Sequence, residues 1–225
     1  AQHLNKHHQK IRSMDSNLDA RIASYELAYR MQNAAPEAVD INKEPDSIRK
    51  LYGKGFGEQC LVARRLVERG VRTIQIYNGH GKNDWDTHGD NFNRHKTLIK
   101  DVDQGCAALI QDLKQRGLLD DTLVIWGGEF GRTPTTEGNN GRDHNPYGYS
   151  MWMAGGGVKP GISYGATDEL GYFIAEDPVH VRDLQATILH LIGLNPHELS
   201  FPYLGLQQRL IGPADGPKVI HDILT

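Results

Sequence analysis

Two short β-branched segments on either side of a long helical pattern constrain the fold most. The segments VRTIQIY (71–77) and TLVIW (122–126) have the composition of strands, and apolar residues recur at helical spacing over 91–116 between them. A third strand pattern, YSMWMA, and a helical pattern over 179–194 follow. Strands that alternate with helices in this way predict an α/β fold with a mostly parallel sheet.

Helical patterns also precede the first strand. They predict helices over 16–32 and about 55–69, joined by a proline-containing stretch that forms an extended connection or short broken turns. The 225 residues are enough for one domain with a sizeable core, or for a large part of a bigger one. We therefore expect a single domain over 1–225, in which residues 1–50 are a helical lead-in.

Charge and hydropathy narrow the classes of partner. The formal net charge is −3, whereas nucleic-acid binding usually needs a basic face, so no nucleic-acid partner is expected. No apolar run approaches the roughly 20 residues that span a bilayer, and residues 1–10 lack the apolar segment of a signal peptide. The two cysteines, Cys60 and Cys106, lie on apolar faces of predicted helices without a CxxC pair, which disfavours a cysteine-based zinc site. The oligomeric state stays open.

The loop after the first predicted strand carries the stretch NDWDTHGDN. It places Asp84, Asp86 and His88 within five positions. Carboxylates together with imidazole suit zinc, manganese or iron. The alternative is a polar loop that caps the next helix, for which Asp90 or Asn91 is a good N-cap residue.

The loop after the second predicted strand is also polar. WGGEFGRTP presents Glu129 between glycines and then Arg132, whose planar guanidinium suits phosphate or sulfate oxygens. The same loop reaches GRDHNP, where Asp143 and His144 stand at a turn. The alternatives are a surface ion pair between Glu129 and Arg132, which contributes little, and a histidine that only hydrogen-bonds the loop.

The two polar loops are expected to meet. In open parallel sheets, ligands bind beyond the carboxyl ends of the strands. If the two strands are parallel neighbours, both loops open on the same edge of the sheet. We therefore expect Asp86, His88, Glu129 and His144 to converge on one pocket that holds a metal ion or an oxyanion.

Several segments resemble a known family, the bacterial domain-of-unknown-function family numbered 1501, which belongs to the alkaline phosphatase-like superfamily and is often labelled sulfatase-like. These segments are SYELAYRMQNAAPEAVD, CLVARRLVERGVRTIQIY, WDTHGDN, LLDDTLVIWGGEFGRTP, GRDHNPYGYSMWMAGGGVKPG, YGATDELGY and DLQATILHLIGL. The resemblance covers nearly the whole chain. It implies a three-layer α/β/α sandwich with metal ligands on loops at strand ends.

The resemblance also implies roles for the polar residues. Asp84 or Asp86 with His88 would fill the first ligand position, Glu129 falls at the first member of a later Asp-His pair, and His144 is similar to the final histidine. The residue after Glu129 is Phe130, which cannot bind metal, so a second metal site would be one ligand short. Asp143 is a further ligand candidate, and Arg132 would partly replace the missing charge.

Relatives usually begin further upstream, with an export signal, a first sheet strand, an acidic ligand and the nucleophile region. The sulfatase C-x-P-x-R signature is absent too, because Val62 stands where proline should follow Cys60. The resemblance therefore implies that this chain is the C-terminal half or so of a family member, incomplete at its N-terminus, and that the whole protein is exported or periplasmic.

These observations lead to one expected function and one alternative. The expected function is metal-dependent hydrolysis of phosphate or sulfate esters of a small molecule or carbohydrate. The metal would be zinc, or else manganese, calcium or iron, and Arg132 would stabilise the developing oxyanion. The alternative is a non-catalytic binding or structural protein that keeps a degenerate metal site.

Overall fold

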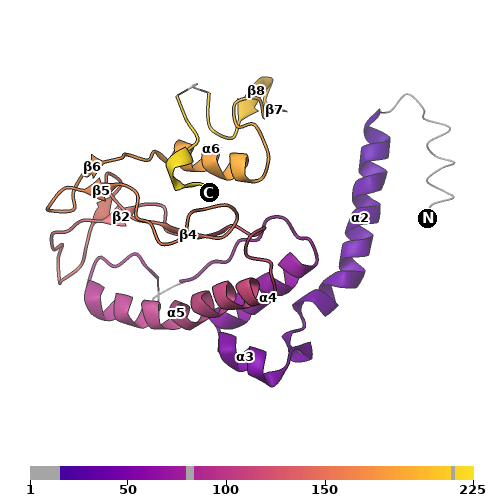
Figure 1. Cartoon of the computed structure of the whole chain (residues 1–225), viewed down its shortest axis with the longest axis horizontal. Coiled ribbons are helices and arrows are strands. Elements are labelled where there is room, and N and C mark those ends of the chain that lie inside the picture. Colours follow the sequence, from indigo (N-terminus) through magenta and orange to yellow (C-terminus); the bar gives the residue numbers. More distant parts are fainter. Residues whose placement is uncertain (1–15, 80–83, 214–215) are drawn as a thin grey trace.

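The structure is a computed structural model that describes residues 16–79, 84–213 and 216–225 (Figure 1). The helices are α2 (Ser16–Val39), η1 (Ile41–Lys43), α3 (Asp46–Tyr52), α4 (Phe56–Glu68), α5 (Asn91–Gln115), α6 (Val181–Leu191) and η2 (His221–Ile223). The strands are β1 (Val124–Trp126), β2 (Gly131–Arg132), β3 (His144–Asn145), β4 (Trp152–Ala154), β5 (Ala166–Thr167), β6 (Ile174–Glu176), β7 (Ser200–Tyr203) and β8 (Leu206–Arg209). Residues 1–15 of the expected lead-in lie outside the described residues.

The pair α4 and α5 forms the main helical core, as their apolar stripes predict. The stripe of α5 buries Leu98, Val102 and Leu113. The two helices approach closely, because a Cβ added to Gly105 would lie 3.0 Å from the Cα of Gly57. None of the described helices has the length and apolarity needed to cross a membrane.

The first helix is longer than predicted. It continues through Pro36 to Val39, where the sequence pattern predicted a break near residue 32. The structural reason lies in a distant side chain: the guanidinium of Arg65 donates to the carbonyl oxygens of Glu37 and Ala38, both at 2.8 Å. Arg65 thereby satisfies carbonyl groups that the end of a helix leaves without partners. Figure 1 shows most of α2 projecting away from the other helices.

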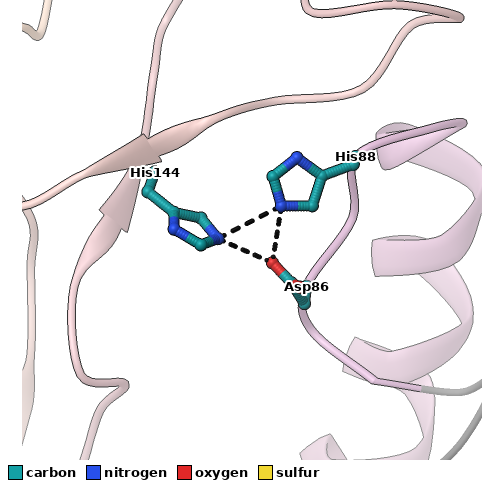
Figure 2. Close-up of side chains that lie close together, drawn as sticks. All are labelled: Asp86, His88 and His144. Carbon is teal, nitrogen blue, oxygen red and sulfur yellow. Dashed lines mark hydrogen bonds and ion pairs between the residues drawn. The ribbon is translucent and has the colours of Figure 1, made fainter.

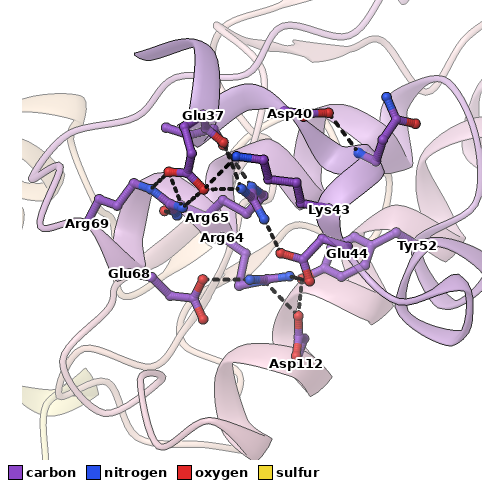
Figure 3. A network of polar contacts seen from close by, with 12 residues as sticks. Glu37, Asp40, Lys43, Glu44, Tyr52, Arg64, Arg65, Glu68, Arg69 and Asp112 are labelled. Atoms are coloured by element: carbon purple, nitrogen blue, oxygen red, sulfur yellow. Dashed lines mark hydrogen bonds and ion pairs between the residues drawn. The ribbon is translucent and has the colours of Figure 1, made fainter. Parts of the chain in front are cut away.

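A buried arginine holds the helical region together (Figure 3). The side chain of Arg64 is 1% exposed and pairs with Glu44 at 2.8 Å, Glu68 at 2.6 Å and Asp112 at 2.9 Å. The hydroxyl of Tyr52 donates to Asp112 at 3.0 Å. Arg64 of α4 thereby contacts Glu44 at the end of η1 and Asp112 of α5, and Asp112 in turn contacts Tyr52 of α3.

The predicted parallel sheet and three-layer sandwich are wrong. In the part of the chain that the structure describes, the strands form four separate two-stranded antiparallel sheets: β1–β4, β2–β3, β5–β6 and β7–β8. The strands of the β1–β4 pair were predicted correctly, but they run antiparallel, with Trp126 opposite Trp152. The fold is therefore not alkaline phosphatase-like.

The segment Val71–Tyr77 explains part of this error. It is β-branched and short but forms no strand, and only Ile74 and Ile76 of its seven residues are partly buried. A β-branched composition favours a strand only where neighbouring strands cover it, because strand propensity depends on cross-strand packing. No described strand pairs with this segment, so the helix α5 does not connect two parallel strands.

The helix α6 belongs to a second, smaller core. Its buried face carries Ala186 and Leu189, which pack against Ile211, whereas the sequence pattern predicted the face of Leu184, Ile188, Leu191 and Ile192. The difference arises from two buried polar residues. Asp183 accepts from the backbone of Lys218 at 2.9 Å, and the hydroxyl of Thr187 accepts from the backbone of Ile220 at 3.0 Å.

Candidate metal site

The candidate site lies where the loop before α5 meets the β2–β3 pair. The loop is fixed from both ends: the indole of Trp85 donates to the Asn78 side chain at 2.8 Å, and the buried hydroxyl of Thr87 contacts His95 at 3.1 Å. Asn83, the first residue of the acidic stretch, lies outside the described residues. These anchors leave the side chain of Asp86, between Trp85 and Thr87, half exposed.

A turn over residues 137–141 is hydrogen-bonded to the same loop. The backbone N–H of Asp90 donates to the carbonyl of Asn139 at 2.8 Å, and that of Asn91 donates to Asn140 at 3.0 Å. Gly141 comes so close to His88 that an added Cβ would lie 2.2 Å from its carbonyl carbon and oxygen. Only glycine permits this approach, which places the start of α5 beside the strand that carries His144.

Three ligand atoms converge at this junction (Figure 2). The Oδ1 atom of Asp86 lies 3.0 Å from Nε2 of His88 and 2.9 Å from Nε2 of His144. The two imidazole nitrogens are 3.1 Å apart. Two neutral imidazole nitrogens and a carboxylate oxygen repel one another when no hydrogen lies between them. This arrangement therefore needs a proton or a metal cation between the three atoms.

The spacing of the three atoms fits a small divalent ion. Bonds of about 2.1 Å hold neighbouring ligand atoms about 3.0 Å apart in octahedral geometry and about 3.4 Å apart in tetrahedral geometry. The observed separations of 2.9–3.1 Å match the octahedral value and lie a few tenths of an ångström below the tetrahedral one. Two histidines and one carboxylate are also a recurrent donor set for transition metals.

Arg132 completes the polar surroundings of the triad Asp86, His88 and His144. The two-residue ladder of β2 and β3 places Arg132 opposite His144, and its Nη2 lies 2.7 Å from Oδ1 of Asp86. Its other terminal nitrogen, Nη1, is buried and has no hydrogen-bond partner within the described residues. A buried donor without a partner costs free energy.

The electrostatics follow from these contacts. Hydrogen bonds from His144 and then from Arg132 lower the pKa of Asp86 to about 2, so its carboxylate is ionised at neutral pH. The pKa of His88 is raised, chiefly by its hydrogen bond to Glu137 and further by the charge of Asp86. Negative charge therefore accumulates around the imidazole pair and favours a bound cation.

An aromatic side chain supports one of the histidines. The ring of Phe130 packs on the ring of His144, with centroids 4.3 Å apart, and the guanidinium carbon of Arg132 lies 5.8 Å from the centroid of Phe130. Phe130, which cannot bind metal, thus packs against one ligand of the triad, His144, and against Arg132. No sequence pattern indicates this contact.

The structure brings together Asp86, His88, His144 and Arg132 of the candidate residues. Asp84, Glu129 and Asp143 are not part of this cluster. Asp84 pairs with Arg94 at 2.8 Å. Glu129 is exposed and makes no hydrogen bond or ion pair with any residue in the described ranges.

The remaining candidate, Asp143, belongs to a different group. Its side chain accepts from the backbone N–H of His144 at 2.7 Å and groups with His88 and Glu137, not with the cluster of Asp86, His88 and His144. The interpretation of the sequence missed Glu137. Its only signal is an acid directly before the turn residues GNNG, which is not a specific pattern.

Comparisons with known proteins bear on the family alone. No curated protein and no solved structure matches the chain. The family described as "Protein of unknown function (DUF1501)" matches residues 1–224 of the 225. The chain therefore belongs to this family.

Proposed function

We propose that the chain binds one divalent metal ion through Asp86, His88 and His144, and that this site hydrolyses phosphate or sulfate monoesters. The observation that carries the proposal is the convergence of three ligand atoms, each 2.9–3.1 Å from the other two. Three protein ligands leave further coordination positions open, as in catalytic sites rather than structural ones.

The donor set favours some metals over others. Two imidazoles and one carboxylate suit zinc, and also manganese or iron. Calcium prefers six to eight oxygen ligands, so it fits two nitrogen donors less well. We therefore propose zinc first and manganese or iron next.

The surrounding residues supply what ester hydrolysis needs. A divalent ion held by the triad would polarise an ester oxygen and activate a water molecule. The side chains of the triad are 40–53% exposed, so an ester can reach them from solvent. Arg132, whose Nη2 lies 2.7 Å from Asp86, would stabilise negative charge that develops on the phosphoryl or sulfuryl oxygens.

One observation favours a non-catalytic alternative. Within the described residues, no serine, threonine or cysteine side chain hydrogen-bonds to the triad, and Thr87, which is next to Asp86 in the sequence, is fully buried. A covalent mechanism with a nucleophile from these residues therefore has no support. The alternative is a protein that binds a metal ion, or a metal-bound anion, without turnover.

An assay with chromogenic esters separates the two functions. The protein is loaded with zinc or manganese and assayed with p-nitrophenyl phosphate and p-nitrophenyl sulfate. A hydrolase turns over at least one ester, and an Asp86→Asn variant loses both the metal and the turnover. Metal binding without turnover of either ester supports the non-catalytic alternative.

A further inference from the structure

We infer that Glu137 is a positioning residue: it fixes the imidazole of His88 so that Nε2 faces the metal position of the triad. The inference rests on the metal site proposed above for its functional meaning. The claim about the imidazole itself is independent of metal, since it concerns which nitrogen carries the hydrogen.

The geometry around His88 separates the two ring nitrogens. Its Nδ1 lies 2.7 Å from Oε2 of Glu137, whereas its Nε2 lies 3.0 Å from Asp86 and 3.1 Å from His144. A carboxylate accepts hydrogen bonds and cannot donate them when ionised. Both ring nitrogens face a carboxylate, but Oε2 of Glu137 is the nearer, and Oδ1 of Asp86 already contacts Arg132 and His144. Glu137 is therefore the acceptor that holds the hydrogen on Nδ1, which leaves the lone pair of Nε2 for a metal ion.

This arrangement is common among metal-binding histidines. The ring nitrogen that does not bind the metal usually donates to a carboxylate or a carbonyl oxygen, which fixes the tautomer and the direction of the ring. The loss of such a partner typically lowers metal affinity about 10- to 100-fold. The second histidine, His144, has no such carboxylate among the described residues and instead packs on Phe130.

The backbone holds Glu137 in place for this role. Its N–H donates to the carbonyl of Gly141 at 3.0 Å, and the N–H of Gly141 donates back at 2.8 Å. The same turn binds the loop of His88 through Asp90 and Asn91. The carboxylate and the imidazole therefore belong to two segments whose backbones are hydrogen-bonded to each other, and their side chains are 44% and 40% exposed.

A direct ligand role for Glu137 is the competing interpretation. The side chains of His88, Glu137 and Asp143 are close enough to hold a second ion. That ion would need Nδ1 of His88 without its hydrogen, which breaks the 2.7 Å hydrogen bond to Glu137. The two interpretations differ in the number of metal ions per chain and in the effect of removing Asp143.

The first test measures the tautomer in the metal-free protein. Histidine side chains are labelled with 15N, and the spectrum of His88 is recorded at a pH where its ring is neutral. We expect the hydrogen on Nδ1 in the wild type and in Glu137→Gln, whose amide oxygen can still accept it, but on Nε2 in Glu137→Ala. An unchanged tautomer in Glu137→Ala overturns the inference.

The second test measures zinc affinity by chelator competition. We expect Glu137→Ala to weaken binding about 10- to 100-fold and Glu137→Gln to recover part of that loss. The matched control is Glu169→Gln, which removes an exposed carboxylate that has no hydrogen-bond or ion-pair partner among the described residues and should bind like the wild type. Equal affinity in Glu137→Ala, or a fall from two ions to one in both Glu137→Ala and Asp143→Ala, contradicts the inference.

The two proposals fail in distinguishable ways. If the wild type binds no zinc, manganese or iron, the proposed function fails, and the tautomer measurement still decides the role of Glu137. If the wild type binds one ion and Glu137→Ala binds it equally well, the metal site stands and the positioning role fails.

Discussion

Arg132 and His144 lie opposite one another on β2 and β3, and both contact the same oxygen of Asp86, at 2.7 Å and 2.9 Å. A two-residue antiparallel ladder thus aligns a guanidinium and an imidazole on one carboxylate. Hydrogen bonds from His144 and then from Arg132 lower the pKa of Asp86, and in the proposed metal site both Asp86 and His144 would be ligands. This relationship separates two roles, metal binding and charge stabilisation, that different substitutions can test.

Replacing Arg132 should affect turnover more than metal binding. In Arg132→Met we expect kcat for the preferred ester to fall about 100- to 1000-fold, because a donor to the developing oxyanion is lost. The zinc content should remain close to one ion per chain, since the three ligands are intact. The control Arg72→Met removes an exposed arginine and should keep the wild-type rate. A wild-type kcat in Arg132→Met would refute the role of this side chain.

Adding a methyl group at Gly141 should disturb the junction between the two loops. The new Cβ would meet the carbonyl group of His88 at 2.2 Å, so the backbone has to move. We expect Gly141→Ala to lower the free energy of unfolding by roughly 1–3 kcal/mol and to weaken zinc binding. Gly89→Ala is the matched control, because the nearest neighbour of its added Cβ among the described residues, the carbonyl oxygen of Asn139, is 4.0 Å away. Similar thermal melting and zinc titration curves for the two variants would argue against a tight junction.

The buried guanidinium of Arg64 should be essential to the helical region. Arg64→Met removes one cationic partner from the buried carboxylates of Glu44 and Asp112, which keep Arg65 and Arg116, and breaking such a buried pair costs up to about 3–5 kcal/mol. We expect urea unfolding to show this loss, while the exposed Arg72→Met changes stability little. A stability close to wild type for Arg64→Met would mean that the surrounding packing, not the ion pairs, holds α4 and α5.

The same network predicts a loss of stability in acid. Burial opposes ionisation of Glu44, but hydrogen bonds from Arg64 and Arg65 outweigh it, and its pKa is lowered below the ordinary 4.5. A lowered carboxyl pKa stabilises the folded state above pH 4.5, and this contribution is lost as the pH falls through the folded-state value. Unfolding measured between pH 7 and pH 3 should therefore show a smaller pH dependence in Glu44→Gln than in the wild type or Glu169→Gln. Equal slopes in all three proteins would contradict the assignment.

The helices could be predicted because their signals are long and local. The stripe of α5 repeats over 25 residues, so its position and its buried side chains Leu98, Val102 and Leu113 follow from periodicity. The end of α2 could not be predicted, because it depends on Arg65, which lies 26 residues beyond Val39. The direction of β1 and β4 depends on pairing, which a three-residue apolar run does not specify.

The candidate site was predictable in part for a similar reason. The alternation of Asp86 and His88 and the position of His144 at a turn indicated ligand chemistry, and the structure brings the three together. The parallel sheet expected to unite them is absent from the described residues, and the turn at Gly141 unites them instead. Glu129 was placed with them because both loops were expected to open on one sheet edge, because it stands between glycines after a strand, and because the family resemblance implied a ligand there.

The most direct test of the metal site is the stoichiometry of zinc in the purified chain and in its His144→Ala and Asp86→Asn variants. The metal is measured by mass spectrometry after dialysis against zinc, and the affinity is measured by calorimetric titration. One ion per chain in the wild type, with the ion lost in both variants and retained in Glu169→Gln, is the predicted result. No bound ion in the wild type, or an ion retained in all variants, would contradict a metal site at Asp86, His88 and His144.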